Sequence, residues 1–259
     1  MGIVNVTPDS FSDGGQFLDA EAAIAHGREL MGEGADILDI GGESTRPGAD
    51  PVDAGEEIRR VIPVIEALAA DGARVSIDTT KAEVARRALD AGATIVNDVS
   101  AFRFDPELPA VVADAGATCV LMHMLGEPRT MQKDPRYEEV VTDVKRFLEE
   151  RIAYATGAGV DEQSIWVDPG IGFGKTLDHN LELIARLDEI AAIGRPVVFG
   201  ASRKSFLGKL TGRQVDERLA GTIAANIIAH DRGARVFRVH DVGPTVDALK
   251  VAAATVRRP

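Results

Sequence analysis

The chain has 259 residues, of which 45% are hydrophobic and 27% are charged, and its formal net charge is −12 at pH 7. A chain with this share of apolar side chains can bury a large core, which excludes a disordered protein. The negative charge argues against nucleic acid or an anionic membrane surface as the main partner. A small anionic ligand stays possible, because local basic residues can outweigh the mean field.

The single cysteine, Cys119, excludes a disulfide within the chain, and this usage is typical of a reducing compartment. Residues 1–5 lack the basic and long apolar segments of a signal peptide. No apolar run approaches the length of a membrane span. We therefore expect a cytoplasmic protein without a membrane segment.

Short apolar runs recur along the chain, and each leads into a polar residue or a Gly-rich turn. The eight runs cover residues 3–5, 37–39, 75–78, 95–98, 119–123, 165–168, 197–200 and 236–240. The segments between them have helical periodicity, and strands that alternate with helices in this way form buried parallel sheets. Eight such units predict a (β/α)₈ TIM barrel, and residues 1–259 are a usual length for one such domain.

Three of the intervening segments carry clear apolar stripes at helical spacing. The stripes are Ile58, Val61, Ile62, Ile65 and Leu68; Val140, Val144, Phe147, Leu148 and Ile152; and Leu177, Leu181, Ile184, Leu187 and Ile190. Glycines just past helices predict left-handed helix ends; they are Gly72, Gly92, Gly116, Gly159, Gly194 and Gly233. The loops after the first two strands, residues 7–15 and 41–51, are long and rich in Gly, Pro and Ser, as binding loops often are.

Polar side chains stand at the carboxyl ends of three predicted strands. They are Asp78, Asn97 and Asp168. Any one of them could cap a helix or brace a loop. Three on one rim indicate a pocket for a flat heterocycle, because an ionised Asp accepts two parallel N–H bonds and an Asn both donates and accepts.

Basic residues gather at the same rim. Arg46 lies in the second long loop, Lys204 follows the seventh strand, and Arg238 and His240 belong to the eighth. Arg238 and His240 are two apart and share a strand face, and barrels often hold phosphate after strands 7 and 8. We expect an anion clamp that Arg46 closes bidentately. The alternative for Arg238 is a side chain that points outward and snorkels.

Residues 202–205 are interpreted as the start of a helix, with Ser202 as its cap or with its N–H groups binding an anion. Met122 and Phe173 are typical of core positions, although on the rim they could wall an aromatic ring.

Two other signals fail. Residues 174–176 (GKT) look like the end of a Walker A loop, but Pro169 stands where that motif needs glycine. Cys119 and His123 alone cannot make a zinc site, and we expect Cys119 in the core.

Eight stretches combine the strand ends and loops described above: residues 5–15 (NVTPDSFSDGG), 41–48 (GGESTRPG), 76–79 (SIDT), 97–100 (NDVS), 121–124 (LMHM), 168–175 (DPGIGFGK), 202–205 (SRKS) and 238–242 (RVHDV). Together they resemble the dihydropteroate synthase family. The resemblance runs from Met1 to the last helix. It implies an enzyme that joins 6-hydroxymethyl-7,8-dihydropterin pyrophosphate to p-aminobenzoate and releases pyrophosphate. Family members are generally homodimers.

The resemblance also implies roles for individual positions. The pterin would be bound by Asp78, Asn97, Met122, Asp168, Phe173, Gly200, Lys204 and Arg238. The pyrophosphate would be held by Asn5, Arg46, Arg238 and His240, with Asn5 on a Mg²⁺ ion. The p-aminobenzoate would be framed by Phe11, Thr45, Pro47 and Ser205. The catalytic residues would be Asp13, Arg46, Lys204, Arg238 and His240, with Asp13 closing over the reacting carbon.

Chemically, this substrate pair suits an SN1-like path, because pyrophosphate leaves easily once its charge is matched and the resulting cation is delocalised into the dihydropterin. Closure of the two long loops would exclude water. Loops 1 and 2 show no inserted residues, so we expect inhibition by sulfonamides, which mimic p-aminobenzoate. Relatives usually carry a few more residues before the position of Gly2, so the first strand is expected to be short or frayed, with Asn5 held loosely.

Three alternatives stay open from the sequence. A pterin-dependent methyltransferase domain shares the barrel and the grip on the pterin, but it has little use for the two long loops. A Schiff-base aldolase would use Lys204 in an apolar setting. A non-catalytic pterin-binding protein would bind the ring without releasing pyrophosphate.

Overall fold

The strands of the computed structural model, which describes residues 1–7, 15–44 and 51–256, form one parallel sheet in which every strand pairs with its neighbour in the chain. The strands are β1 (Gly2–Asn5), β2 (Leu38–Gly41), β3 (Val75–Asp78), β4 (Ile95–Asp98), β5 (Thr118–Met122), β6 (Ile165–Asp168), β7 (Val197–Phe199) and β8 (Ala234–Phe237). The sheet closes where Ile3 N donates to Val239 O and Val239 N donates to Met1 O, each at 3.0 Å. The predicted (β/α)₈ barrel is confirmed.

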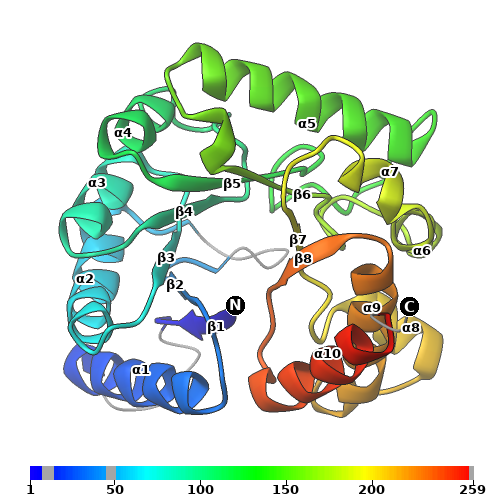
Figure 1. Ribbon diagram of the computed structural model, residues 1–259. Coiled ribbons are helices and arrows are strands. Elements are labelled where there is room, and N and C mark those ends of the chain that lie inside the picture. Colours follow the sequence, from blue (N-terminus) through cyan, green and yellow to red (C-terminus); the bar gives the residue numbers. More distant parts are fainter. Residues whose placement is uncertain (8–14, 45–50, 257–259) are drawn as a thin grey trace.

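Helices surround the strands on all sides (Figure 1). They are α1 (Gly15–Gly32), α2 (Ala54–Ala70), α3 (Ala82–Asp90), α4 (Leu108–Ala115), α5 (Val140–Gly157), α6 (Leu177–Ala185), α7 (Leu187–Ala191), α8 (Ser205–Thr211), α9 (Leu219–Asp231) and α10 (Val242–Val256), with short 3₁₀ turns η1 (Glu162–Ser164) and η2 (Val215–Glu217). None of the helices in the described part of the chain is long and apolar enough to cross a bilayer. All six glycines predicted to end helices have positive φ.

The sixth predicted helix is wrong as a single element. It divides into α6 and α7 at Arg186, whose backbone (φ −122°, ψ 30°) is not helical. Its guanidinium reaches across to Glu139, the N-cap of α5, at 2.7 Å as well as to Glu182 and Glu189. Leu181 of the expected stripe is 37% exposed, and the buried face of α6 consists of Asn180, Leu183 and Ile184. β1 is short, as expected, but it is not frayed, since all four of its residues pair with β2.

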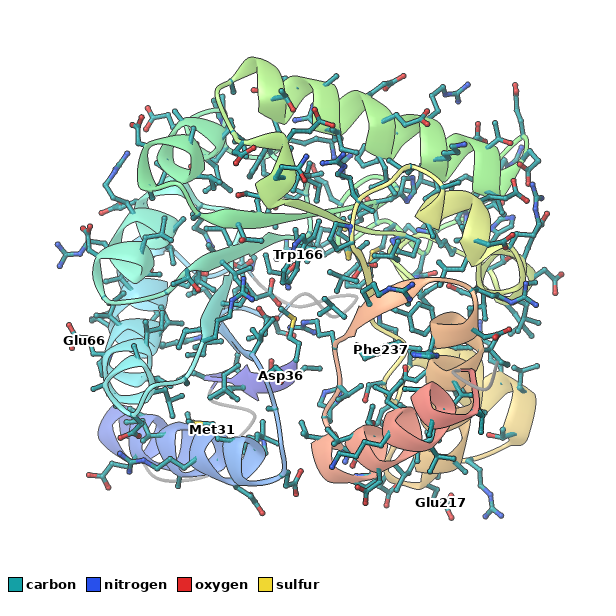
Figure 2. All side chains as sticks on the ribbon, in the orientation of Figure 1. Met31, Asp36, Glu66, Trp166, Glu217 and Phe237 are labelled. Carbon is teal, nitrogen blue, oxygen red and sulfur yellow. The ribbon has the colours of Figure 1, made fainter. Side chains whose placement is uncertain are left out.

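Side chains inside the barrel form an apolar layer, followed two residues later by a layer that includes Asp39, Asn97, Asp168 and Arg238. Ile37, Ile95, Val120 and Val198 form a buried cluster with Met1, Trp166 and Val236 packed against it. Figure 2 shows Trp166 within the ring of helices, with Glu66 and Glu217 outside it. Successive strand residues point to opposite faces, so the residue two positions later lies above each of these on the inner face. Those later residues are Ile3, Asp39, Asn97, Met122, Asp168, Gly200 and Arg238.

Strand register sets polar groups side by side at the carboxyl ends. Asn5 pairs with Gly41, Gly41 with Asp78, and Asp78 with Asn97, across four neighbouring strands. Gly41 contributes no side chain to this row, and a Cβ there would lie 3.5 Å from Cβ of Asp78. The row therefore leaves open space beside the Asp78 carboxylate.

The loop after β6 depends on close backbone approach at one glycine. Gly170 has φ +68°, and a Cβ there would lie 1.8 Å from the carbonyl oxygen of His123. Gly194 has a similar φ of +86°, but a Cβ there would meet no atom within 4 Å.

We expect Gly194→Ala to lower the free energy of unfolding by about 1–2 kcal/mol, the usual cost of a left-handed non-glycine residue. Gly170→Ala adds a clash with backbone and should cost at least about 3 kcal/mol or prevent folding. Urea unfolding of both variants measures the difference. Equal losses would show that the approach to His123 does not constrain this loop.

Candidate active site

A cavity of about 60 Å³ opens at the carboxyl ends of the strands. It is lined by Ile3, Asp78, Asn97, Val99, Met122, Asp168, Phe173, Gly200, Ser202, Lys204, Arg238 and His240. All eight residues predicted to bind the pterin lie on this lining, together with His240 from the predicted anion clamp. Ile3, Val99 and Ser202 are lining residues that the sequence analysis did not assign to a ligand.

Arg238 connects two buried carboxylates from the opposite side of the barrel seam. Its Nε donates to Asp39 Oδ2 at 2.5 Å and its Nη2 donates to Asp78 Oδ2 at 2.8 Å. The Arg238 side chain is 23% exposed and that of Asp39 is fully buried. The alternative of an outward-facing Arg238 is therefore wrong. Arg238 stands one residue beyond β8 rather than inside it.

Asp39 is the residue of this network that sequence reasoning missed. Its Oδ2 also accepts a hydrogen bond from Asn97 Nδ2 at 3.0 Å. Its Oδ1 is buried and has no hydrogen-bond partner among the described residues. The available signal was its position two residues after Ile37, which places it on the inner strand face beside Asp78.

Lys204 bridges the loop after β6 and the cavity. Its Nζ donates to the backbone carbonyl of Ile171 and lies 4.6 Å from the centre of the Phe173 ring. Burial lowers the pKa of Lys204 to about 8, although the negative charge of Asp168 opposes that shift. A cation in this position can bind an acceptor on a ring that Phe173 contacts.

The carboxylates of Asp78 and Asp168 are held out of water. Burial raises the pKa of Asp78 to about 7, against the opposing effect of Arg238. Burial also raises the pKa of Asp168, against the opposing effect of Lys204 and of the hydrogen bond from Gly170 N to Oδ1 at 2.6 Å. A Cβ at Gly200 would come within 3.9 Å of Asp168 Oδ2, so glycine leaves room in front of this carboxylate.

Ser202 does not cap a helix, contrary to that interpretation of the sequence. α8 begins at Ser205 with Lys204 as its N-cap, because Arg203 adopts a left-handed φ of +57° just before it. The Ser202 hydroxyl instead accepts from His240 N at 3.2 Å and lies 3.0 Å from His240 Nδ1. Ser202 thereby fixes the imidazole at the cavity edge.

The remaining predicted residues lie outside the cavity or outside the described chain. Asn5 is half-buried at the end of β1, and Ser205 is exposed at the start of α8. The positions Phe11, Asp13, Thr45, Arg46 and Pro47 fall outside the described residues. Within residues 1–7, 15–44 and 51–256, no group of three His, Cys, Asp or Glu side chains could hold a metal ion. Cys119 is buried in the core, as expected.

The geometry suits a flat polar heterocycle. Carboxylates and an amide line the cavity to read ring N–H groups, Lys204 offers a donor, and Met122 and Phe173 supply apolar walls. The surrounding cations also suit an anionic substituent on the ring.

Comparison with known proteins shows which family the chain resembles. Residues 1–240 match the model of the family described as pterin binding enzyme. Dihydropteroate synthase of Escherichia coli K12 is 46% identical over 257 residues, which are 99% of this chain and 91% of that protein. The chain spans only 30% of a probable bifunctional folylpolyglutamate synthase/dihydropteroate synthase of Haloferax volcanii, at 48% identity over 98% of this chain.

Solved structures agree with the sequence relatives. Xanthomonas albilineans dihydropteroate synthase with 4-aminobenzoic acid superposes with a TM-score of 0.94 and 52% identity, covering 100% of this chain and 93% of that one. Yersinia pestis dihydropteroate synthase with a sulfonamide drug complex has a TM-score of 0.94 and 42% identity, covering 99% and 94%. The chain therefore belongs to the dihydropteroate synthase family of pterin-binding transferases.

Proposed function

We propose that the cavity binds 6-hydroxymethyl-7,8-dihydropterin pyrophosphate and that the chain transfers its pterin-methyl group to the amine of p-aminobenzoate, releasing pyrophosphate. The observation that carries this proposal is that all eight candidate pterin residues line a single cavity. The 4-aminobenzoic acid and the sulfonamide named with two related structures support the second substrate. The methyltransferase alternative has no such support.

Asp168, Asn97 and Asp78 read the polar edge of the pterin in this proposal. A carboxylate accepts paired N–H bonds from the amidine-like part of the ring. A ring without those donors leaves buried acceptors unpaired, and that penalty gives the site its selectivity. Lys204 donates to a ring acceptor from beside Asp168, since a Cβ at Gly200 would lie within 4 Å of both side chains.

The reaction breaks the bond between the pterin methylene carbon and the pyrophosphate oxygen, and then forms a carbon–nitrogen bond to p-aminobenzoate. Arg238 and His240 bind the departing diphosphate. An arginine has five N–H donors, and the two contacts of Arg238 with Asp39 and Asp78 leave others for phosphate oxygens. The methylene cation is delocalised into the electron-rich ring, and the new anilinium nitrogen then releases its proton.

Further roles are proposed for the remaining candidate residues, most of which lie outside the described chain. Arg46 would add to the anion clamp, and Asp13 would lie over the reacting carbon. Phe11, Thr45, Pro47 and Ser205 would frame p-aminobenzoate. Ser205 is the one of these four that the structure describes, and it is exposed and within one residue of Lys204.

We propose that a Mg²⁺ ion binds at this site mainly through the phosphate oxygens of the substrate. Among the described residues no acidic cluster could hold the ion alone. Mg²⁺ commonly keeps several waters and binds substrate phosphates with one or two protein oxygens, and Asn5 can offer one such oxygen at the end of β1. When bound, the ion would neutralise the leaving group.

We further propose a homodimer in the cytoplasm. Three helices that pack against one another, α6, α8 and α9, carry the exposed apolar residues Leu181, Leu210 and Ile228. Where such side chains gather into one apolar patch, they mark interaction surfaces.

Pyrophosphate release tests the function directly. With both substrates and Mg²⁺ we expect steady release that stops without p-aminobenzoate and falls when the metal is chelated. A sulfonamide should inhibit competitively with p-aminobenzoate. Tight pterin binding without pyrophosphate release would contradict the proposal and indicate a binding protein.

The carboxylate of Asp168 should be needed for pterin binding. Asp168→Asn replaces an acceptor by a donor, so we expect the pterin KM to rise about 10- to 100-fold, equivalent to about 1.5–3 kcal/mol for a charged hydrogen bond. Asp161→Asn is the control, because Asp161 also accepts an N–H two residues ahead, at the other end of β6. An unchanged pterin KM for Asp168→Asn would remove Asp168 from the site.

The pH dependence of kcat/KM for the pterin substrate should be bell-shaped. The pKa of Asp78 is raised to about 7, so acid protonates this acceptor and activity should rise as the pH passes that value. The pKa of Lys204 is lowered to about 8, so base removes its proton and activity should fall above that value. Asp78→Asn should lose the acid limb while keeping the alkaline limb. An acid limb that persists in Asp78→Asn would assign it to another group.

A further inference from the structure

Backbone carbonyls of the loop after β6 are bonded one by one. Phe173 N donates to Gly170 O, and Lys204 Nζ donates to Ile171 O. Gln132 Nε2 donates to Gly172 O, Lys175 Nζ to Phe173 O, and Tyr137 OH to Gly174 O. Every backbone carbonyl of residues 170–174 therefore accepts a hydrogen bond. The donors come from several parts of the chain, and together they fix the loop that carries Phe173.

Lys175 is the most deeply buried of these donors, at 3% exposure. Its Nζ lies 3.0 Å from Phe173 O, 2.9 Å from His123 Nδ1 and 3.5 Å from His123 O. It does not line the cavity. Burial lowers the pKa of Lys175 well below its usual range, and Asp168 opposes that effect. Burying an amine is costly unless its N–H groups find acceptors. The acceptors of Lys175 lie within reach only in this conformation of the loop.

His123 supplies the other half of the contact. It directly follows Met122 of the cavity wall, and its backbone N donates to Asp168 O at 3.0 Å. The ring is buried against Phe147, edge to face at 4.8 Å between centres. Burial lowers the pKa of His123 to about 2, with Lys175 and Arg103 contributing. The 2.9 Å contact with the Lys175 amine fits a neutral ring whose Nδ1 accepts and whose proton is on Nε2, and this is the tautomer that the inference below requires.

We propose that Lys175 and His123 form a positioning pair that locks the loop after β6 against the end of β5 and so sets Phe173 and Asp168 at the spacing the pterin ring requires. Neither residue touches the ligand. The inference rests on the proposed function for the identity of the ring, whereas the contact itself is a property of the fold. The pair acts on pterin binding specifically, because it holds the two strand ends that carry the pterin wall.

Lys175→Met keeps an unbranched side chain, one atom shorter, and removes the donor. We expect the pterin KM to rise about tenfold or more and the p-aminobenzoate KM to change less than about twofold, since displacement of binding groups by a fraction of an ångström is enough to lose a ligand. Arg195→Met is the matched control, because Arg195 also donates to a backbone carbonyl, that of Glu162 at 2.7 Å, at the opposite end of the barrel. Equal KM changes for both substrates, or an unchanged pterin KM, would overturn the proposal.

Substitutions of His123 test the pair from the other side. His123→Asn retains an oxygen acceptor near the place of Nδ1, and His123→Leu retains none. We expect the asparagine variant to keep a pterin KM within about threefold of wild type and the leucine variant to resemble Lys175→Met. The same loss in both variants would mean that ring packing, rather than the acceptor, positions the wall. This comparison also decides the matter if Lys175→Met does not fold.

A spectroscopic measurement separates this inference from the proposed function. In ¹⁵N-histidine-labelled protein at neutral pH, the Nδ1 of His123 should have the shift of an unprotonated, hydrogen-bonded nitrogen, and Lys175→Met should move it. The fluorescence of bound 6-hydroxymethylpterin reports ring affinity without turnover. If the wild type released no pyrophosphate, the proposed function would fail, while the pterin affinity of the variants would still test the pair. An Nδ1–H tautomer would overturn the pair whatever the activity.

Discussion

The salt bridges of Arg238 with Asp39 and Asp78 are the constraint on which the rest of the site depends. They join the end of β8 to β2 and β3, across the point where the sheet closes. Burying three charges is costly unless each is paired, so the network is stable only when the barrel is closed and in register. The same carboxylate of Asp39 fixes the amide of Asn97. Arg238 and Asn97, to which we assign the diphosphate and the pterin ring, are therefore positioned by a single buried oxygen.

The barrel separates stability from chemistry along each strand. Apolar side chains such as Ile95 and Trp166 fill the interior, and the polar residue two positions later faces the cavity. Because the strands are parallel, every such polar residue emerges at the same rim. The strand ends themselves therefore form the cavity, without an added helix or strand. It is the upper inward-facing layer of a packed barrel, and its floor is the core.

Contacts outside the cavity lining fix the loop after β6. Gly170 allows the loop after β6 to approach the carbonyl of His123, and Lys175 bonds that loop to the same residue. In the proposed positioning pair, two buried polar residues that do not line the cavity keep part of its lining in place. Lys175, which made residues 174–176 look like a Walker A loop, and His123, which has no partner for a zinc site among the described residues, contact each other.

Local pattern by itself determined the eight strands, the helix-ending glycines and the rim that carries Asp78, Asn97 and Asp168, because alternation and periodicity are properties of neighbouring residues. The motifs were specific enough to point to the family. Tertiary structure alone decided that Arg238 turns inward to Asp39 and that Lys175 contacts His123. It also decided that Ser202 forms a hydrogen bond with His240 and does not cap α8. It also divided the sixth helix at Arg186, whose partner Glu139 is the N-cap of α5. Each of these depends on a contact between residues far apart in the chain, which a pattern of neighbouring residues does not contain.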